Sequence, residues 1–233
     1  LNAKKHRVFT MGKSEFIETF DQMLKHSDEP HGDPGKINST FISKICRAEI
    51  TVALCGNGAD ELFAGYLPFK GLGVGELVKL IPDSVMSVLK TVAARTLPAS
   101  DRYLGLKFLV DAYLQGFPAR SNAARFEQWL DCLPWEVLKH LVRGPIHSSR
   151  YLPEIEKLGE AKSPIQQLLY FYQKIFLPEF ICANTDRASM QSSLEVRSPF
   201  LSRPLVEFAN TLPDGYKYTL TRSKRLLRDA LGR

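Results

Sequence analysis

The stretch Ile50-Thr-Val-Ala-Leu-Cys-Gly-Asn-Gly-Ala-Asp-Glu-Leu-Phe-Ala-Gly-Tyr66 decides the fold of this chain. Its first part, Ile50 to Leu54, is a nearly continuous apolar run, which predicts a strand buried on both faces of a parallel sheet. Cys55-Gly-Asn-Gly58 then breaks the run with two glycines, which permit a positive φ and let a ligand approach the backbone. Asp60 and Glu61 open a predicted helix, whose dipole favours carboxylates at this end.

A strand, a glycine turn and an acidic helix start together predict a phosphate and metal site. In open α/β sheets, ligands bind just outside the carboxyl ends of the strands. The same three elements also occur in α/β proteins that bind nothing at this position. The local pattern alone therefore leaves a binding site and a plain structural turn both open.

Several blocks of the sequence resemble elements of the asparagine synthetase family, in the family's order. The part from Leu54 to Tyr66 is similar to the signature L-S-G-[DE]-G-x-D-E-L-F-x-G-Y. Five other blocks also match family patterns. Asp28–Pro34 resembles D-E-P-x-x-D-P, Leu177–Glu179 resembles L-P-[DE], and Asp186–Met190 resembles D-R-x-S-M. Ser193–Leu201 resembles S-L-E-x-R-x-P-F-L-D, and Lys224–Arg228 resembles K-x-x-L-R. Each block alone is weak, but together they cover nearly the whole chain, which is identified as a member of this family.

Composition excludes some classes of protein. The 233 residues are 44% hydrophobic, enough for one core with a helical lobe. No apolar run reaches the roughly 18 residues that a membrane span needs, and the first residues lack the apolar segment of a signal peptide. Four widely spaced cysteines predict neither a disulfide framework nor a zinc site. These features favour a cytoplasmic protein.

The net charge of +6 raises the question of nucleic acid as a partner. Basic residues gather in Arg222-Ser-Lys-Arg225, with Arg228 nearby. A solvated helix face explains this cluster, and so do the phosphates of a nucleotide substrate. The chain has no basic motif with interleaved aromatic residues, so nucleic acid is disfavoured.

The order of predicted elements favours the second half of a doubly wound parallel sheet of the ATP-pyrophosphatase type with a large α-helical lobe. Residues 6–10 and 50–54 are predicted strands, and residues 13–26 and 39–47 are predicted helices. The predicted parts are 1–70, the nucleotide-binding core; 71–165, a proline-interrupted helical lobe; and 166–233, a segment with short helices at 205–212 and 223–231. The aromatic residues within 163–180 are expected to pack in the core.

The resemblance implies a reaction. Asparagine synthetases activate a carboxylate, that of aspartate, with ATP, release pyrophosphate, and then let ammonia displace AMP. Magnesium (Mg²⁺) bridges the phosphates in such sites. The implied substrates are ATP, aspartate or another carboxylate, and ammonia from glutamine; the implied partner is a glutaminase domain, and a homo-oligomer stays open.

The resemblance also assigns roles to individual residues. The candidate catalytic residues are Lys224, Asn57 and Glu195, the candidate nucleotide-binding residues are Cys55, Gly56, Gly58 and Arg197, and Asp60 is the candidate metal ligand. Each role has a structural alternative: Asp60 as a helix-start carboxylate, Lys224 as a surface lysine, and Glu195 with Arg197 as an ion pair. Alternate residues of an extended segment point the same way, which would bring the last two together.

Three positions depart from the family pattern. Cys55 replaces a serine, which keeps the size but weakens the hydrogen bond. Asn57 replaces an acidic residue that handles the proton lost by ammonia, and an amide cannot accept that proton. Ser202 replaces an aspartate.

The family's S-G-G-x-D-S ATP loop does not occur in the sequence. We therefore expect this chain to be the C-terminal part of a synthetase domain. Two rivals remain: an amidotransferase or cyclase acting on another carboxylate, and a non-catalytic remnant that serves as an interaction module.

Overall fold

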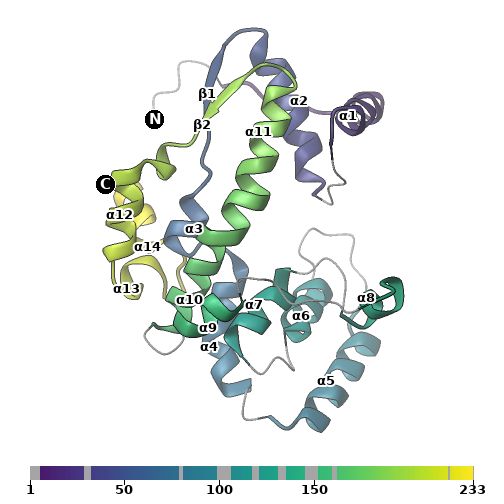
Figure 1. The fold of residues 1–233 in the computed structure, drawn as a ribbon, viewed down its shortest axis with the longest axis vertical. Helices are drawn as coiled ribbons and strands as arrows, with labels where there is room; N and C mark the ends of the chain where they lie inside the picture. The colour runs from purple at the N-terminus through teal and green to yellow at the C-terminus, as the bar shows by residue number, and fades with distance from the viewer. Residues whose placement is uncertain are drawn as a thin grey trace. The chain divides into compact units, whose positions relative to one another are not determined.

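The structure is a computed structural model that describes residues 6–28, 33–78, 81–98, 106–116, 121–130, 135–144, 152–158, 162–219 and 221–232. Its contacts divide the chain into two compact units. Unit 1 consists of Leu1–Gly58 and Phe176–Arg203, and unit 2 of Ala59–Ile175 and Pro204–Arg233 (Figure 1). The division of the chain into parts 1–70, 71–165 and 166–233 stays a prediction.

Unit 1 contains a small parallel sheet with helices packed beside it. Strand β1 (Val52–Leu54) pairs in parallel with β2 (Glu195–Arg197), and Leu54 lies opposite Arg197 (Figure 1). Its other elements are α1 (Lys13–Lys25), α2 (Gly35–Arg47), the end of the π-helix η1 (Tyr172–Cys182), α11 (Ala183–Met190) and the 3₁₀ turn η2 (Pro199–Leu201). Helix α11 packs against α2. An α/β fold with a parallel sheet is thus confirmed, and the predicted helices at 13–26 and 39–47 form.

Two expectations for unit 1 are wrong. Residues 6–10 are extended but form no strand, because within the described residues their backbone pairs with no neighbour. The β1 strand forms but is not buried: Ile50, Val52 and Leu54 are 43%, 40% and 73% exposed. A sheet of two described strands leaves much of its surface open, so the apolar residues of this segment are not packed on both faces as their pattern predicts.

Within its described ranges, unit 2 consists of helices joined by short non-helical segments, with one isolated bridge between Tyr218 and Ser223. Its helices are α3 (Ala59–Phe63), α4 (Leu67–Val78), α5 (Asp83–Thr96), α6 (Leu106–Gln115), α7 (Asn122–Leu130), α8 (Trp135–Leu141), α9 (Leu152–Leu158), α10 (Pro164–Phe171), the start of η1, α12 (Arg203–Thr211), α13 (Asp214–Lys217) and α14 (Arg225–Leu231). Helices α12 and α14 confirm the two short helices predicted near the C-terminus.

Aromatic side chains form the core of unit 2. Phe69, Phe126, Phe171 and Tyr172 are all at most 3% exposed. Rings of Phe126 and Phe171 meet edge to face, with their centroids 6.1 Å apart. Two members of the aromatic stripe predicted within 163–180 therefore pack in the core, as expected.

In the described parts of the chain, no helix combines the length and the apolar character needed to cross a membrane. Cys46, Cys55 and Cys182 are free thiols.

Candidate functional site

The first group of candidate residues lies where β1 and β2 end. The strands are parallel, so their carboxyl ends share one edge, and Cys55 follows β1 as Ser198 follows β2. The Cys55 backbone N–H donates to the Arg197 carbonyl over 2.9 Å, and the Cys55 Sγ lies 2.9 Å from the Ser198 hydroxyl. Sequence reasoning missed Ser198, although its place directly after a predicted extended segment could have indicated it.

The two glycines after β1 differ in what surrounds them. A Cβ atom on Gly56 would meet nothing within 4 Å, so this backbone is open to a ligand. Gly58 has φ +94°, and a Cβ atom there would lie 2.3 Å from the Leu201 Cδ2. Gly58 is therefore required by its conformation and by packing on Leu201, whereas nothing in the described structure crowds Gly56.

The Asn57 side chain is fixed by helix α11. Its Nδ2 donates to the Thr185 Oγ1 over 2.7 Å. That helix is tied in turn to the Asp28–Pro34 block, since Arg187 lies 3.6 Å from Asp28 and the Asn184 amide donates to Asp33. The middle of that block, residues 29–32, lies outside the described residues. No sequence pattern indicated Thr185, because its contact with Asn57 depends on how α11 packs.

Glu195 and Arg197 pair with each other across one face of β2. The Arg197 Nε donates to the Glu195 Oε1 over 2.7 Å, and the two side chains are 54% and 66% exposed. An exposed pair of this kind contributes little stability. The structural alternative therefore describes their present contact, while both groups remain accessible to a substrate.

The second group of candidates lies in unit 2, where Lys224 meets Asp60. The Lys224 Nζ is 2.8 Å from the Asp60 Oδ1, and the side chains are 30% and 33% exposed. Lys224 adopts a left-handed backbone with φ 52°, and its N–H donates to the Phe63 carbonyl at the end of α3 over 3.1 Å. The turn before α14 is thus attached to the helix that carries Asp60.

Gly65 lies directly beneath this ion pair. A Cβ atom on Gly65 would be 1.7 Å from the Asp60 Oδ1 and 2.3 Å from the Lys224 Cε. The Gly65 N–H also donates to the Asp60 carbonyl over 3.0 Å. Sequence reasoning missed this residue, although it is the glycine of the F-x-G-Y part of the signature.

Gly65→Ala is expected to displace the Asp60–Lys224 pair while the fold persists. The clashing atoms belong to movable side chains, so the ion pair shifts before the backbone does. The loss of stability should stay within about 1–3 kcal/mol, and pyrophosphate exchange in an active full-length protein should fall at least as far as after removal of the Asp60 charge. Circular dichroism and thermal unfolding report the fold.

Gly215→Ala is the matched control, because a Cβ atom there meets nothing within 4 Å and Gly215 lies inside helix α13. It should leave exchange unchanged and keep or slightly raise stability. Equal behaviour of the two variants would show that the space above Gly65 is not needed.

Glu61, next to Asp60, has a structural role. It is 1% exposed and accepts a hydrogen bond from the Tyr66 hydroxyl over 2.5 Å. Burial, then the contact with Glu61, raises the pKa of Tyr66 far above its usual range. The Tyr66 ring stacks on Tyr172 with centroids 4.7 Å apart, and burial likewise raises the pKa of Tyr172. The buried carboxylate thus anchors α3 and leaves Asp60 as the neighbouring group for a ligand.

The residues fit a magnesium ion that arrives with its substrate. Within the described ranges, no three His, Cys, Asp or Glu side chains cluster as a metal site would require. Mg²⁺ is usually held by one or two carboxylates together with substrate phosphates and water. Asp60, with Glu61 engaged by Tyr66, can supply one such carboxylate.

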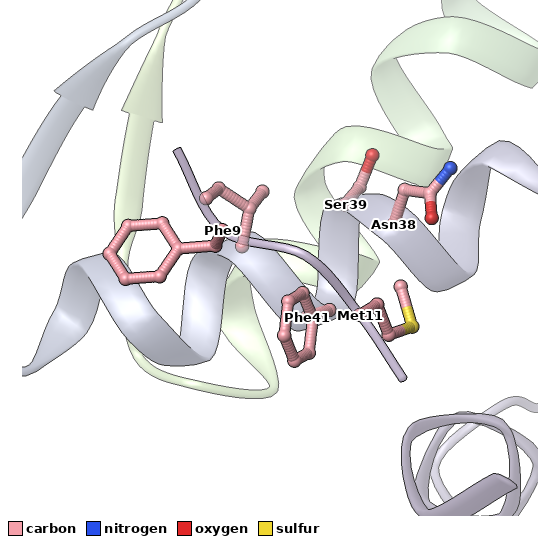
Figure 2. A pocket seen from close by; sticks show the side chains of 6 residues that line it. Phe9, Met11, Asn38, Ser39 and Phe41 are labelled. Atoms are coloured by element: carbon pink, nitrogen blue, oxygen red, sulfur yellow. The ribbon is translucent and has the colours of Figure 1, made fainter. Parts of the chain in front are cut away.

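Unit 1 also contains a cavity of about 350 Å³. Figure 2 shows it where the extended residues Phe9 and Met11 cross helix α2 beside Asn38, Ser39 and Phe41. Among the described residues that line it there is no candidate site residue and no charged side chain.

Comparisons with known proteins agree on one family. The family model for asparagine synthase matches residues 2–233. The chain is 30% identical to asparagine synthetase [glutamine-hydrolyzing] 1 of Bacillus subtilis, over 93% of this chain and 33% of that protein. It is 27% identical to a provisionally named asparagine synthetase [glutamine-hydrolyzing] of Mycobacterium tuberculosis, over 97% of this chain and 34% of that protein.

A further relative carries a different name. The chain is 24% identical to amidase chyE of Penicillium rubens, over 95% of this chain and 35% of that protein. It thus spans about a third of the length of the curated relatives it matches. No solved structure matches it significantly. On the strength of the family model, which covers nearly every residue, the chain belongs to the asparagine synthase family.

Proposed function

We propose that this chain is part of an ATP-dependent amide-forming enzyme that adenylates the side-chain carboxylate of aspartate and then lets ammonia replace AMP to give asparagine. In this proposal the ammonia comes from glutamine, through a glutaminase domain of a longer protein in the cytoplasm. Membership of the asparagine synthase family supports the reaction class. The relatives named asparagine synthetase support the substrate.

The observation that carries the proposal is the Asp60–Lys224 pair. A cation and a carboxylate from distant parts of the sequence meet at 2.8 Å, about one third exposed, above a glycine that leaves them room. Both are the residues to which the resemblance assigns phosphate chemistry. A surface lysine without a role would not need Gly65 beneath it or a left-handed backbone.

The proposed chemistry follows from charge. Adenylation brings a polyphosphate and a carboxylate together, so a positioned cation stabilises the negative charge of the transition state. Lys224 supplies that cation, and Asp60 holds it in place until the nucleotide is bound. A magnesium ion, when bound to Asp60 and the phosphates, supplies further positive charge. Gly56 and the Cys55 backbone offer the nucleotide an accessible chain segment.

The fold proposal extends the observed sheet. We assign β1 and β2 to a doubly wound parallel sheet of the ATP-pyrophosphatase type. The support is the exposed apolar surface of β1 and α1, which includes Phe16 at 46%, Ile17 at 56% and Leu54 at 73% exposure. Further strands and helices of a protein about three times as long, as the relatives are, would cover this surface.

Asp60→Asn tests the metal assignment. In the full-length protein, this change should remove most magnesium-dependent adenylation, measured as pyrophosphate–ATP exchange against magnesium concentration, because an amide is a weaker ligand and releases Lys224. Asp229→Asn is the control, since Asp229 pairs with Arg222 on the surface and makes no contact with Lys224. Unchanged exchange in Asp60→Asn would exclude this carboxylate as the ligand.

A second function is an amidotransferase or cyclase that acts on another carboxylate. Asn57 favours it, because the residue is an amide bonded to Thr185 where the family has an acidic group. The similarity to a protein named amidase chyE points the same way. Substrate screening by pyrophosphate release would separate the two: aspartate alone supports the first function, and another acid supports the second.

A further inference from the structure

A second cavity, which lies in unit 2, is lined by two lysines that have no role in the function proposed above. It has a volume of about 210 Å³ and lies between α10, α12 and α13, with the ends of α9 and η1 completing its wall. Its lining consists of two lysines, three amides and three larger side chains: Lys162, Lys217, Gln166, Gln173, Asn210, Leu158, Leu169 and Tyr170. None of these residues belongs to the Asp60–Lys224 group.

Lys217 is the unusual member of this lining. The residue is only 2% exposed, yet within the described residues its ammonium group makes no hydrogen bond or ion pair. Burial lowers the pKa of Lys217 and the charge of Asp214 raises it, while Asp214 itself accepts a hydrogen bond from the Ser163 hydroxyl over 2.5 Å. A nearly buried lysine that makes no direct polar contact of its own suits a ligand that supplies one.

The other polar groups of the cavity suit the same kind of ligand. Lys162 adds a second ammonium at the exposed side, and its side chain also lacks a partner in the described structure. Gln173 and Asn210 bond to each other through their amides over 3.1–3.2 Å, which holds both in place at the wall. No carboxylate is among the described residues that line the cavity. The lining therefore presents cations and amides to whatever enters.

We propose that this cavity is a binding site for a small oxyanion, the phosphate or carboxylate group of a small metabolite, with Lys217 as its inner contact and Lys162 at its entrance. The volume supports a small ligand: drug-sized molecules occupy about 300–1,000 Å³, and one water takes about 30 Å³. Charge-assisted hydrogen bonds from two ammonium groups would hold such an anion. Burial also lowers the pKa of Lys217, and a bound anion would favour its charged form.

The cavity wall also contacts the helix that carries Asp60. The Gln173 Nε2 donates to the Glu61 carbonyl in α3 over 3.1 Å as well as to Asn210. One amide side chain thus belongs both to the cavity and to the support of α3. The proposed site itself does not depend on the function proposed above.

Calorimetric titration of this chain tests the proposal, with inorganic phosphate and malonate as probes at constant ionic strength. At least one of them should bind at a single site in the low millimolar range or tighter, and the stronger one identifies the phosphate or the carboxylate as the ligand group. Lys217→Met and Lys162→Met should each weaken that binding about tenfold or more. No saturable binding of either probe would overturn the proposal.

Lys174→Met is the matched control, because Lys174 is exposed, lies next to Gln173 in the sequence and does not line the cavity. It removes the same charge and should leave binding unchanged. An equal loss in this variant would reveal general electrostatic attraction and would also overturn the proposal.

Thermal unfolding separates a ligand role of Lys217 from a structural one. Without phosphate or malonate, Lys217→Met should be at least as stable as the original chain, because it removes a charge that burial disfavours; with the bound probe, the original chain should gain stability and the variant should not. Marked destabilisation of the ligand-free variant would assign Lys217 to the core instead. Lys162→Met, at an exposed position, tests binding without risk to folding.

Discussion

Lys224→Met is expected to lower the kcat of adenylation about a hundredfold or more in the full-length protein, with little change in the apparent KM for ATP. The change removes one positioned charge that acts mainly on the transition state, which has this kinetic signature. A hundredfold loss corresponds to about 2.7 kcal/mol of transition-state stabilisation. Steady-state pyrophosphate release at varied ATP gives both constants.

The structure makes this substitution interpretable. Methionine keeps the length of the lysine stem, and both residues are unbranched at Cβ, so the left-handed backbone at position 224 meets a similar penalty in each. The N–H bond to the Phe63 carbonyl is a main-chain contact and survives the change. What disappears is the ammonium group and its 2.8 Å contact with Asp60.

Arg222→Met is the control for general charge. Arg222 lies in the same basic cluster, but it pairs with Asp229 and is 51% exposed in its side chain. Its loss should leave kcat within about twofold, because exposed ion pairs contribute little. A rise in KM alone for Lys224→Met, with kcat intact, would make Lys224 an ordinary phosphate anchor. A similar loss of kcat in both variants would mean that the summed positive potential of the basic cluster, and not the position of Lys224, supports the reaction.

Local patterns predicted the elements that local physics controls. The helical spacing of apolar residues predicted α1, and the glycine turn after β1 allowed for the positive φ that Gly58 adopts. The resemblance assigned roles to Lys224 and Asp60 separately, and their pairing was found only in the structure.

Contacts that depend on packing between distant segments were not predictable. Gly65 matters because Asp60 and the Lys224 stem cross above it, and Thr185 matters because α11 brings it to Asn57. The burial of Ile50–Leu54 failed for a related reason: an apolar run shows that a strand can be covered and says nothing about what covers it. The burial of Lys217 beside a cavity likewise left no trace in the sequence.

Asn57→Asp is expected to raise the rate of amide formation in the full-length protein if ammonia is the nucleophile. A carboxylate at this position can accept the proton that ammonia loses, whereas the amide cannot. A well-placed general base is worth roughly 10²- to 10⁴-fold. The rate of adenylation, measured as pyrophosphate exchange, should change little, because this step does not remove a proton from ammonia.

The surroundings of Asn57 suit the test. Aspartate has nearly the same size and shape, and the Thr185 hydroxyl, which now accepts from Nδ2 over 2.7 Å, can rotate to donate to the new carboxylate. The side chain should therefore stay in place, so that a change in rate reports chemistry and not a displaced loop. Thr185→Val in the Asn57→Asp background is the control, since it removes that donor and should release the carboxylate.

Three results of this experiment have different meanings. A gain confined to the ammonia step supports an asparagine-forming enzyme slowed by its amide. No change in either step means that another group takes the proton or that the nucleophile is not ammonia, which favours the amidotransferase or cyclase. A fall in adenylation means that position 57 contacts the nucleotide, because a carboxylate there repels the phosphates that Asp60 and Lys224 are proposed to serve. That result would remove Asn57 from the proton-transfer step and assign it to binding.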